Sequence, residues 1–275
     1  MAKIDKSKYS KEQIKELRRQ KAERKLRKRS SNILKNSPDT YNVLVLKHGK
    51  KYTAEYVNKM YRMVKKHCTL PFNFYCLTED ITGLDNDIKV IPLPGDIEAN
   101  GWWYKPYIFS ADLPIDGIIL YIDLDMVIVK NIDMLFTYMP NASCVLRDFT
   151  RVMRPKWEKY NSSLIRYRKG QFLRLWEEFK KDSNYVMRRH FGDQDFLWER
   201  TKGEFSLWPD NWIRSWKWEI RQSKKFKPGA ARGNRQLETV ENCVAPPDCC
   251  IVAFHGDPNM HNCHDPFIVD NWHKI

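Results

Sequence analysis

Two carboxylates interrupt the most apolar stretch of the chain, residues 117–129. Asp123 and Asp125 lie two residues apart in the run Ile-Ile-Leu-Tyr-Ile-Asp-Leu-Asp-Met-Val-Ile-Val. A buried charge is costly unless it is paired or bound to a metal. Carboxylate oxygens suit Mg²⁺ and Mn²⁺, and these ions commonly bridge to substrate phosphates. The pattern favours a divalent-metal site; the alternative is a pair of strand-end carboxylates that cap neighbouring loops.

Four further segments carry polar residues suited to sugar or phosphate chemistry. In chain order they are Trp102-Trp103-Tyr104-Lys105-Pro106, Asn161-Ser162-Ser163-Leu164-Ile165, Gly192-Asp193-Gln194-Asp195-Phe196 and Phe254-His255-Gly256-Asp257-Pro258-Asn259-Met260. With the Asp-x-Asp pair, they resemble the ordered motifs of the GT-A glycosyltransferases, in particular the retaining, glycogenin-like branch. The resemblance spans about residues 41–265. The Trp102 segment, Trp208-Pro209 and Ser215-Trp216-Lys217 look closest to an uncharacterised bacterial and phage subgroup.

This resemblance implies a role for each motif. The metal, Mn²⁺ or Mg²⁺, would be held by Asp123, Asp125 and His255, and would act as a Lewis acid on the diphosphate of a nucleotide-sugar, for which a UDP-sugar is expected. The residues that would act on the transferred sugar are Lys105, Asp193, Gln194 and Asp195. Residues implied to border the donor are Leu124, Asn161, Ser162, Ser163 and Gly256. For Asn161 and Ser162 an ordinary role in a strand is nearly as probable.

The C-terminal motif departs from the family pattern. Gly256 follows His255 directly, and Asn259-Met260 stands where the family has Lys-Pro. The family lysine contacts the donor diphosphate. In this chain the contact with the donor diphosphate is either absent or made by Lys217 or by the basic loop at residues 224–235.

The nucleoside is expected at the ends of the first two strands. Lys47, His48 and Gly49 follow the first strand, and Tyr52 is placed to stack on a base or simply to pack at a helix start. Thr78 and Asp80, after the second strand, are expected near the ribose.

The elements that must position these residues alternate along the chain. Short β-rich runs at 42–46, 72–77, 89–93 and 117–122 alternate with helical patterns at 53–64 and 102–111, which predicts a parallel α/β sheet. Ligands of such sheets bind beyond the carboxyl ends of the strands. Later, 163–168 reads as a strand and 170–181 as an amphipathic helix. The family resemblance implies a Rossmann-like mixed sheet flanked by helices.

Charge divides the chain into a basic extension, residues 1–38, and one glycosyltransferase-like domain, residues 39–275. Residues 1–35 hold 14 Lys or Arg against 4 Asp or Glu, which leaves +4 of the total +14 for the rest. Residues 11–29 favour a helix with few apolar positions. The extension is either a solubilising arm or a contact for a polyanion, with hydroxymethylated phage DNA as the acceptor to test first. A glycan precursor or a protein is the alternative acceptor.

Composition restricts the compartment. The chain is 42% hydrophobic and 30% charged, as in ordinary globular proteins. No apolar run reaches the ~20 residues of a membrane helix. The N-terminus lacks a signal-peptide core, and seven cysteines, an odd number, favour free thiols. We expect a cytoplasmic protein in a bacterial or phage-infected cell.

Three other functions fit parts of the sequence. Asp123-x-Asp125 also matches the nucleophile motif of haloacid-dehalogenase-type phosphatases, although about 80 residues of βαβ pattern precede it. Cys249, Cys250, His255, His261, Cys263 and His264 suit a zinc module, although they lack paired spacing. The basic extension suits a nucleic-acid-binding protein without enzymatic activity.

Overall fold

A seven-stranded mixed sheet forms the centre of the molecule. The computed structural model describes residues 40–275 apart from 96, 98, 100, 222–242 and 257, so the basic extension and the 224–235 loop lie outside the described residues. The sheet has the order β3-β2-β1-β4-β7-β6-β8. Its strands are β1 (Tyr41–Lys47), β2 (Phe72–Thr78), β3 (Lys89–Pro92), β4 (Ile118–Ile122), β6 (Cys144–Arg147), β7 (Tyr160–Arg168) and β8 (Ser206–Leu207). All run parallel except β7, which is antiparallel to both its neighbours.

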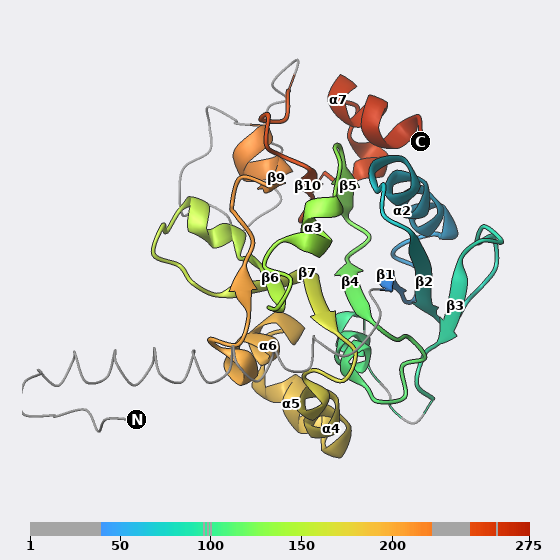
Figure 1. Cartoon of the computed structure of the whole chain (residues 1–275), viewed down its shortest axis with the longest axis vertical. Helices are drawn as coiled ribbons and strands as arrows, with labels where there is room; N and C mark the ends of the chain where they lie inside the picture. Colours follow the sequence, from blue (N-terminus) through green and yellow to red (C-terminus); the bar gives the residue numbers. More distant parts are fainter. Residues whose placement is uncertain (1–39, 96, 98, 100, 222–242, 257) are drawn as a thin grey trace, which may run out of the picture.

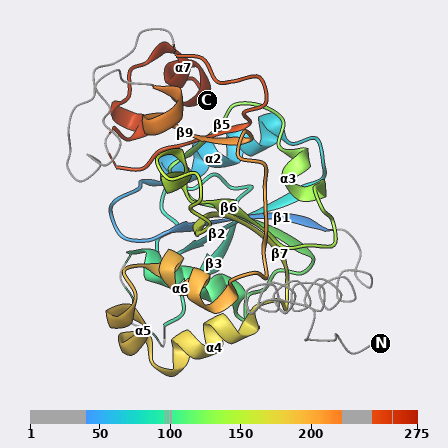
Figure 2. The same ribbon diagram turned by 90° about the vertical axis from the view of Figure 1, so that its left-hand side faces the viewer.

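Helices cover both faces of this sheet (Figures 1 and 2). On one side lie α2 (Ala54–His67), α3 (Asp133–Thr137) and a three-stranded sheet made of β5 (Met126–Ile128), β10 (Ile251–Ala253) and β9 (Ile213–Ser215). On the other side lie η2 (Gly101–Phe109), α4 (Leu173–Lys181), α5 (Ser183–Arg189) and α6 (Asp193–Thr201). The remaining short helices are η3 (Phe149–Val152), η4 (Trp216–Ile220), η5 (Met260–Asn262), α7 (Pro266–Ile268) and η6 (Val269–His273).

The alternation of side chains along β1 explains the two cores. Val43 and Val45 point into the core beneath α2, whereas Leu44 points into the core beneath η2 and α4. A strand buried on both faces reads as a continuous apolar run, as the sequence does here. On α2, which confirms the helix predicted at 53–64, Val57, Met60 and Val64 are fully buried.

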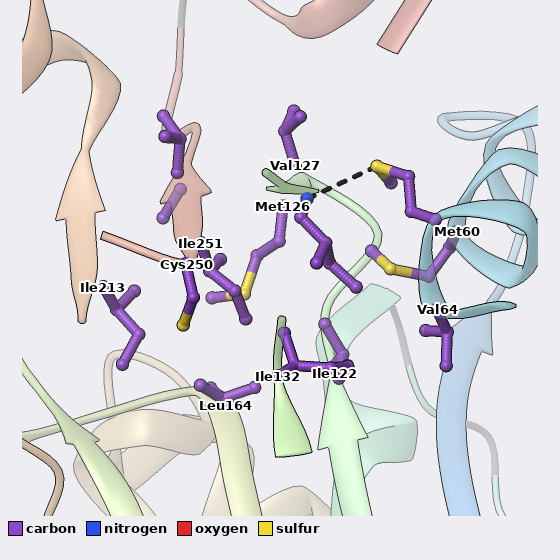
Figure 3. Packing of buried hydrophobic residues seen from close by; sticks show 14 of the residues in the cluster. Met60, Val64, Ile122, Met126, Val127, Ile132, Leu164, Ile213, Cys250 and Ile251 are labelled. Carbon is purple, nitrogen blue, oxygen red and sulfur yellow. Dashed lines mark hydrogen bonds between the residues drawn. The ribbon is translucent and has the colours of Figure 1, made fainter. Parts of the chain in front are cut away.

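The small sheet packs against α2 through sulfur-rich and branched side chains (Figure 3). Met126 and Val127 of β5 lie between Met60 of α2 and the neighbouring strand β10, whose Ile251 pairs with Ile128. This packing fixes β5, and therefore fixes Asp125, which immediately precedes it.

The helix predicted at residues 102–111 is a 3₁₀ helix, η2. Pro106 lies inside it and has no N–H to donate, which disfavours a regular α-helix. Stacking of Trp103 on Phe179 of α4, with ring centroids 5.8 Å apart, holds η2 against the sheet's second face.

The reversed direction of β7 brings its first residues to the edge where the parallel strands end. There the Asp123 N–H donates to the Ser163 carbonyl at 2.8 Å, so β7 and the end of β4 are joined at this edge. Residues after β1, β2 and β4 and at the start of β7 therefore share one rim. Of the helices described, none has the length and apolar character that crossing a membrane requires.

Candidate active site

A buried ion cluster forms where β4 ends. Lys105 Nζ lies 3.1 Å from both carboxylate oxygens of Asp123 and 3.3 Å from Asp193 Oδ2. It also donates to Ser162 Oγ at 3.2 Å. The Tyr121 hydroxyl donates to Asp123 Oδ1 at 2.5 Å. Four segments that are distant in sequence, η2, β4, β7 and α6, thus meet at one lysine.

Charge balance explains the protonation of this cluster. Burial opposes the charged form of Lys105, but the adjacent Asp123 and Asp193 outweigh it and raise the lysine's pKa above its ordinary value. Burial raises the pKa of Asp193, and Lys105 partly opposes this rise. Opposite charges within about 4 Å favour the charged forms of both partners. We conclude that Lys105 is a cation at neutral pH.

Asp125 lies beside this cluster without a cation in direct contact among the described residues. Its Oδ2 accepts a hydrogen bond from the Tyr52 hydroxyl at 3.2 Å. Burial and the negative charge of Asp123 raise the pKa of Asp125 to about 6. Burial, with Asp125 and Asp123, also raises the pKa of Tyr52, so this phenol remains a hydrogen-bond donor. Asp125 therefore adds a further negative charge to a site where Lys105 already faces two carboxylates.

This donor set fits a divalent cation in part. The two carboxylates are hard oxygen ligands, and the raised pKa of Asp125 reflects a repulsion that a cation would relieve. Within residues 40–275 as far as they are described, no three His, Cys, Asp or Glu side chains are close enough to hold a metal. The third ligand, His255, therefore stays a prediction.

His255 is adjacent to the carboxylates through the backbone. The Phe254 N–H donates to the Asp125 carbonyl at 2.8 Å, which aligns the end of β10 with the start of β5. The His255 ring bonds Ser215 Oγ through Nε2 at 2.6 Å. Burial and the charge of Lys217 lower the pKa of His255 to about 4. The imidazole is therefore neutral at physiological pH, the form that binds metals.

Lys217 reaches the segment where the family pattern places its lysine. A methyl group on Gly256 would lie 3.4 Å from Lys217 Nζ. Gly256 has φ +74°, in the left-handed region that favours glycine. Lys217 lies in η4. Ser215 caps the start of this helix, because its hydroxyl accepts a hydrogen bond from the Trp218 N–H at 3.1 Å. A cation thus stands beside His255 and Gly256, although its origin in the sequence differs from the family pattern.

The loop after β1 is held to the end of β2 by Glu79. The Gly49 N–H donates to Glu79 Oε1 at 2.6 Å, and His48 Nδ1 is 3.3 Å from Glu79 Oε2. The His48 ring packs on Tyr104, the neighbour of Lys105, with centroids 4.6 Å apart. This loop therefore adjoins η2 and the buried cluster.

Beside it, the predicted ribose-contacting residues are engaged with each other. The buried Lys47 ammonium is 3.6 Å from Asp80 Oδ2. The Thr78 hydroxyl accepts from the Asp80 N–H at 3.1 Å and is itself buried. Asp80 remains half exposed and accessible to a ligand, whereas Thr78 and Lys47 are accessible only in small part.

The β7 residues split between the cluster and backbone roles. Ser162 contacts Lys105, as described above, while Asn161 Oδ1 accepts from the Ser163 N–H at 2.9 Å. Ser163 contributes its carbonyl to Asp123. Leu124 is 2% exposed, within the hydrophobic core, so its side chain points away from the rim and only its backbone remains for a donor.

The three residues of the Asp-Gln-Asp motif point in different directions from the start of α6. Asp193 joins Lys105, Gln194 Nε2 donates to Asp148 Oδ2 at 2.8 Å, and Asp195 Oδ1 is 3.0 Å from Lys159 Nζ. The motif therefore does not line one surface as a block.

Sequence reasoning missed Asp148 and Tyr121. Asp148 follows β6, contacts Gln194, and its negative charge raises the pKa of His255, against the larger effects that lower it. It therefore links the α6 motif to the C-terminal motif. Tyr121 lies in an apolar run and therefore reads as a core residue. The available signal was its spacing, because residues two apart in a strand share a face and its hydroxyl could reach Asp123.

The zinc alternative finds no support at its cysteines. Cys249, Cys250 and Cys263 are buried free thiols, and burial raises the pKa of each. His261 instead bonds the Tyr56 hydroxyl through Nδ1 at 2.5 Å.

Comparison with known proteins identifies the architecture. No family model and no curated protein matches the chain by sequence. Among solved structures, the galactosyltransferase LgtC in complex with donor and acceptor sugar analogues matches with a TM-score of 0.56 at 13% identity, over 85% of this chain and 96% of that one. The bifunctional glycosyltransferase WbbM matches with a TM-score of 0.59 at 11% identity, over 86% of this chain and 50% of that one. The chain has the GT-A glycosyltransferase fold. The fold predicted from the sequence is confirmed.

Proposed function

We propose that this GT-A chain is a metal-dependent glycosyltransferase that moves a sugar from a UDP-sugar to an acceptor. The observation that carries the proposal is the buried cluster of Lys105, Asp123 and Asp193 beside Asp125, at the strand ends of this fold. Support comes from the match to LgtC, whose structure holds donor and acceptor sugar analogues. The finer parts of the proposal are a retaining outcome and membership of a bacterial or phage subgroup.

Asp123 and Asp125 would hold Mn²⁺ or Mg²⁺, with His255 as the proposed third ligand. When bound, the metal would stabilise the negative charge that grows on the leaving diphosphate. Lys217, beside Gly256, is positioned to add a second positive charge there. The His255 imidazole is neutral at physiological pH, which is the form that ligates a metal.

The remaining residues position the sugar and the nucleoside. Lys105 fixes the Asp123 and Asp193 carboxylates, and Gln194 is oriented by Asp148. We propose that Asp193 and Gln194 bind sugar hydroxyls or stabilise positive character at the anomeric carbon. The His48–Gly49 loop and Tyr52 border the proposed nucleoside site, with Asp80 near the ribose.

The DNA acceptor suggested by residues 1–35 rests on a segment outside the described residues. If it is correct, DNA affinity should fall by ~0.9 log units per neutralised phosphate for each log unit of added salt. Filter binding of the full chain, and of a chain without residues 1–35, measures this slope. Equal shallow slopes for both proteins would remove the DNA acceptor.

A donor screen tests the proposed activity directly. Melting temperature is measured with UDP, GDP and the common UDP-sugars, each with and without Mn²⁺. We expect UDP and one UDP-sugar to stabilise the chain only when Mn²⁺ is present, because bound ligand stabilises the folded state by mass action. No nucleotide-dependent shift under any condition would contradict the proposal.

A further inference from the structure

A cavity of about 400 Å³ opens beside the proposed reaction centre, between the end of α5, one face of α6 and Lys159. Ligand pockets generally hold 300–1,000 Å³. The α6 residues that line it are Asp195, Trp198 and Glu199, at positions i, i+3 and i+4 of one helix face, and Lys202 follows directly after the helix. No residue of the buried Lys105 cluster lines this cavity.

Two aromatic side chains form apolar parts of its wall. Phe191 is 95% exposed, which leaves its ring accessible to a ligand. Trp198 is held in place from two sides: its ring meets Tyr160 edge-on at 4.6 Å, and Lys202 Nζ lies 5.3 Å from its centroid. A fixed indole and an exposed phenyl ring offer flat faces to the C–H face of a ligand.

Between the aromatic rings lie paired polar groups. Lys159 bonds Asp195 at 3.0 Å, and Arg189 Nη2 bonds Glu199 Oε1 at 2.8 Å. His190 also lines the cavity, and its buried Nε2 has no hydrogen-bond partner among the described residues. The carboxylate, guanidinium and ammonium groups together present both donors and acceptors, as a polyol requires.

The charges of the lining disfavour a phosphate-rich ligand. Both carboxylates face the cavity already paired with Lys159 and Arg189, and the remaining cation, Lys202, lies over Trp198. A phosphate could pair with Lys159 or Arg189 only by displacing these carboxylates, so the lining offers a polyanion little net attraction. A neutral ligand with vicinal hydroxyls bonds to these groups with the ion pairs intact.

We propose that this cavity binds a neutral saccharide as part of the acceptor. The inference rests on the proposed glycosyltransferase function. The first turn of α6 carries both Asp193, in the buried cluster, and Asp195, in the cavity, so one helix joins the two sites although the two side chains lie on different faces of it. A backbone bond from the Asp148 N–H to the Lys159 carbonyl at 2.9 Å ties the cavity wall to the residue that orients Gln194.

The test compares saccharide binding by the full chain and by Phe191→Ala. The probes for calorimetric titration are the methyl glycosides of glucose, galactose and N-acetylglucosamine, their β-linked disaccharides and a short DNA duplex. The phenyl ring is almost wholly exposed, so its removal leaves the packing intact. Leu173→Ala, also an exposed apolar residue but on α4 and outside the cavity, is the matched control.

We expect at least one saccharide to bind the wild type and the Leu173→Ala control equally, and to bind Phe191→Ala about tenfold more weakly, as expected for loss of one aromatic contact. Equal affinity of Phe191→Ala, binding of no saccharide, or duplex binding that Phe191→Ala weakens would each overturn the inference. UDP binding with Mn²⁺, measured by melting temperature on the same samples, separates the two claims: its absence refutes the proposed function, whereas its presence without saccharide binding refutes only this inference.

Discussion

The two halves of the proposed donor site are built on opposite principles. On the large sheet, the buried Lys105 lies 3.1 to 3.3 Å from the carboxylates of the partly buried Asp123 and the buried Asp193, one cation between two acids. On the small sheet, His255 is kept neutral and Lys217 remains partly accessible, without an ion pair to any described acidic side chain.

The difference indicates which half is shaped by folding and which is reserved for the ligand. Charges that satisfy each other inside the protein must form for the chain to fold, and removing one partner leaves an unpaired buried charge. The neutral His255 ring and the partly accessible Lys217 need no charged partner within the protein for the chain to fold. Substitutions in the first half should therefore affect stability and turnover together, and those in the second half should affect ligand binding alone.

Lys105→Met should have the largest effect on stability. It leaves the buried Asp193 and the partly buried Asp123 without their cation, so we expect a loss of about 3–5 kcal/mol in the free energy of unfolding. Urea unfolding measures it, and Lys130→Met, an exposed lysine beyond β5, should change it little. If Lys105→Met unfolds at the same urea concentration as the wild type, the ion pairs of Lys105 do not stabilise the fold.

Asp125→Ala should reduce Mn²⁺-dependent donor hydrolysis by about 100-fold or more, since it removes a charged metal ligand. The fold should survive because no described cation forms an ion pair with Asp125, so the substitution leaves no buried charge unpaired. Release of UDP is the measurement, with the exposed Asp270→Ala as control. Unchanged turnover would remove Asp125 from the metal site.

Asp195→Asn sharpens the division within α6. If Asp195 acts at the sugar or acceptor, transfer should slow by about tenfold or more while UDP affinity stays unchanged. Steady-state kinetics and UDP titration on one preparation give both values. Parallel losses would assign Asp195 to the nucleotide or to structure.

Lys217→Ala tests the small-sheet half. We expect UDP affinity to fall about tenfold, in line with one charge-assisted contact to phosphate, and the melting temperature of the ligand-free protein to stay unchanged. Lys274→Ala, an exposed lysine near the C-terminus, is the control. A lowered melting temperature with unchanged UDP affinity would show that Lys217 supports the fold instead.

The smallest effects concern pH in metal-free protein. The pKa of Asp125 is raised from 3.8 to about 6, so its charge destabilises the fold as pH rises through this interval. Asp125→Asn should therefore raise the free energy of unfolding by about 1–2 kcal/mol above pH 6 and leave it unchanged below pH 4.

Asp133 provides the opposite case. Burial opposes its charge, but hydrogen bonds from Thr69 and Asn131 outweigh this and lower its pKa from 3.8 to about 2. Its stabilising effect is present above pH 4 and is lost as pH falls through about 2, so Asp133→Asn should weaken the fold only at higher pH. Unfolding curves in EDTA that move the same way for both variants would contradict the assigned charges.

The sequence predicted those parts of the site where a residue type is unusual for its surroundings. Asp123 and Asp125 stand out because carboxylates are rare inside apolar strands, and the β1, β2 and β4 runs are long enough to show their type. The small-sheet strands β5, β9 and β10 have three residues each, too few for a periodic pattern, and were not predicted.

Pairing across the chain was beyond sequence patterns. Nothing near Asp148 indicates that it meets Gln194, 46 residues away, or that Lys159 and Asp195 bond across 36 residues. The same applies to the acceptor cavity, whose lining is brought together only when α5, α6 and the start of β7 pack.

The most direct test of the account is a crystal structure of the chain soaked with UDP and Mn²⁺. We predict anomalous density for the metal between the Asp123 and Asp125 carboxylates, with the diphosphate lying between the metal and Lys217. Nucleotide bound away from these residues, or a metal held by other side chains, would contradict the central claim that the end of β4 and the Gly256 segment form one donor site.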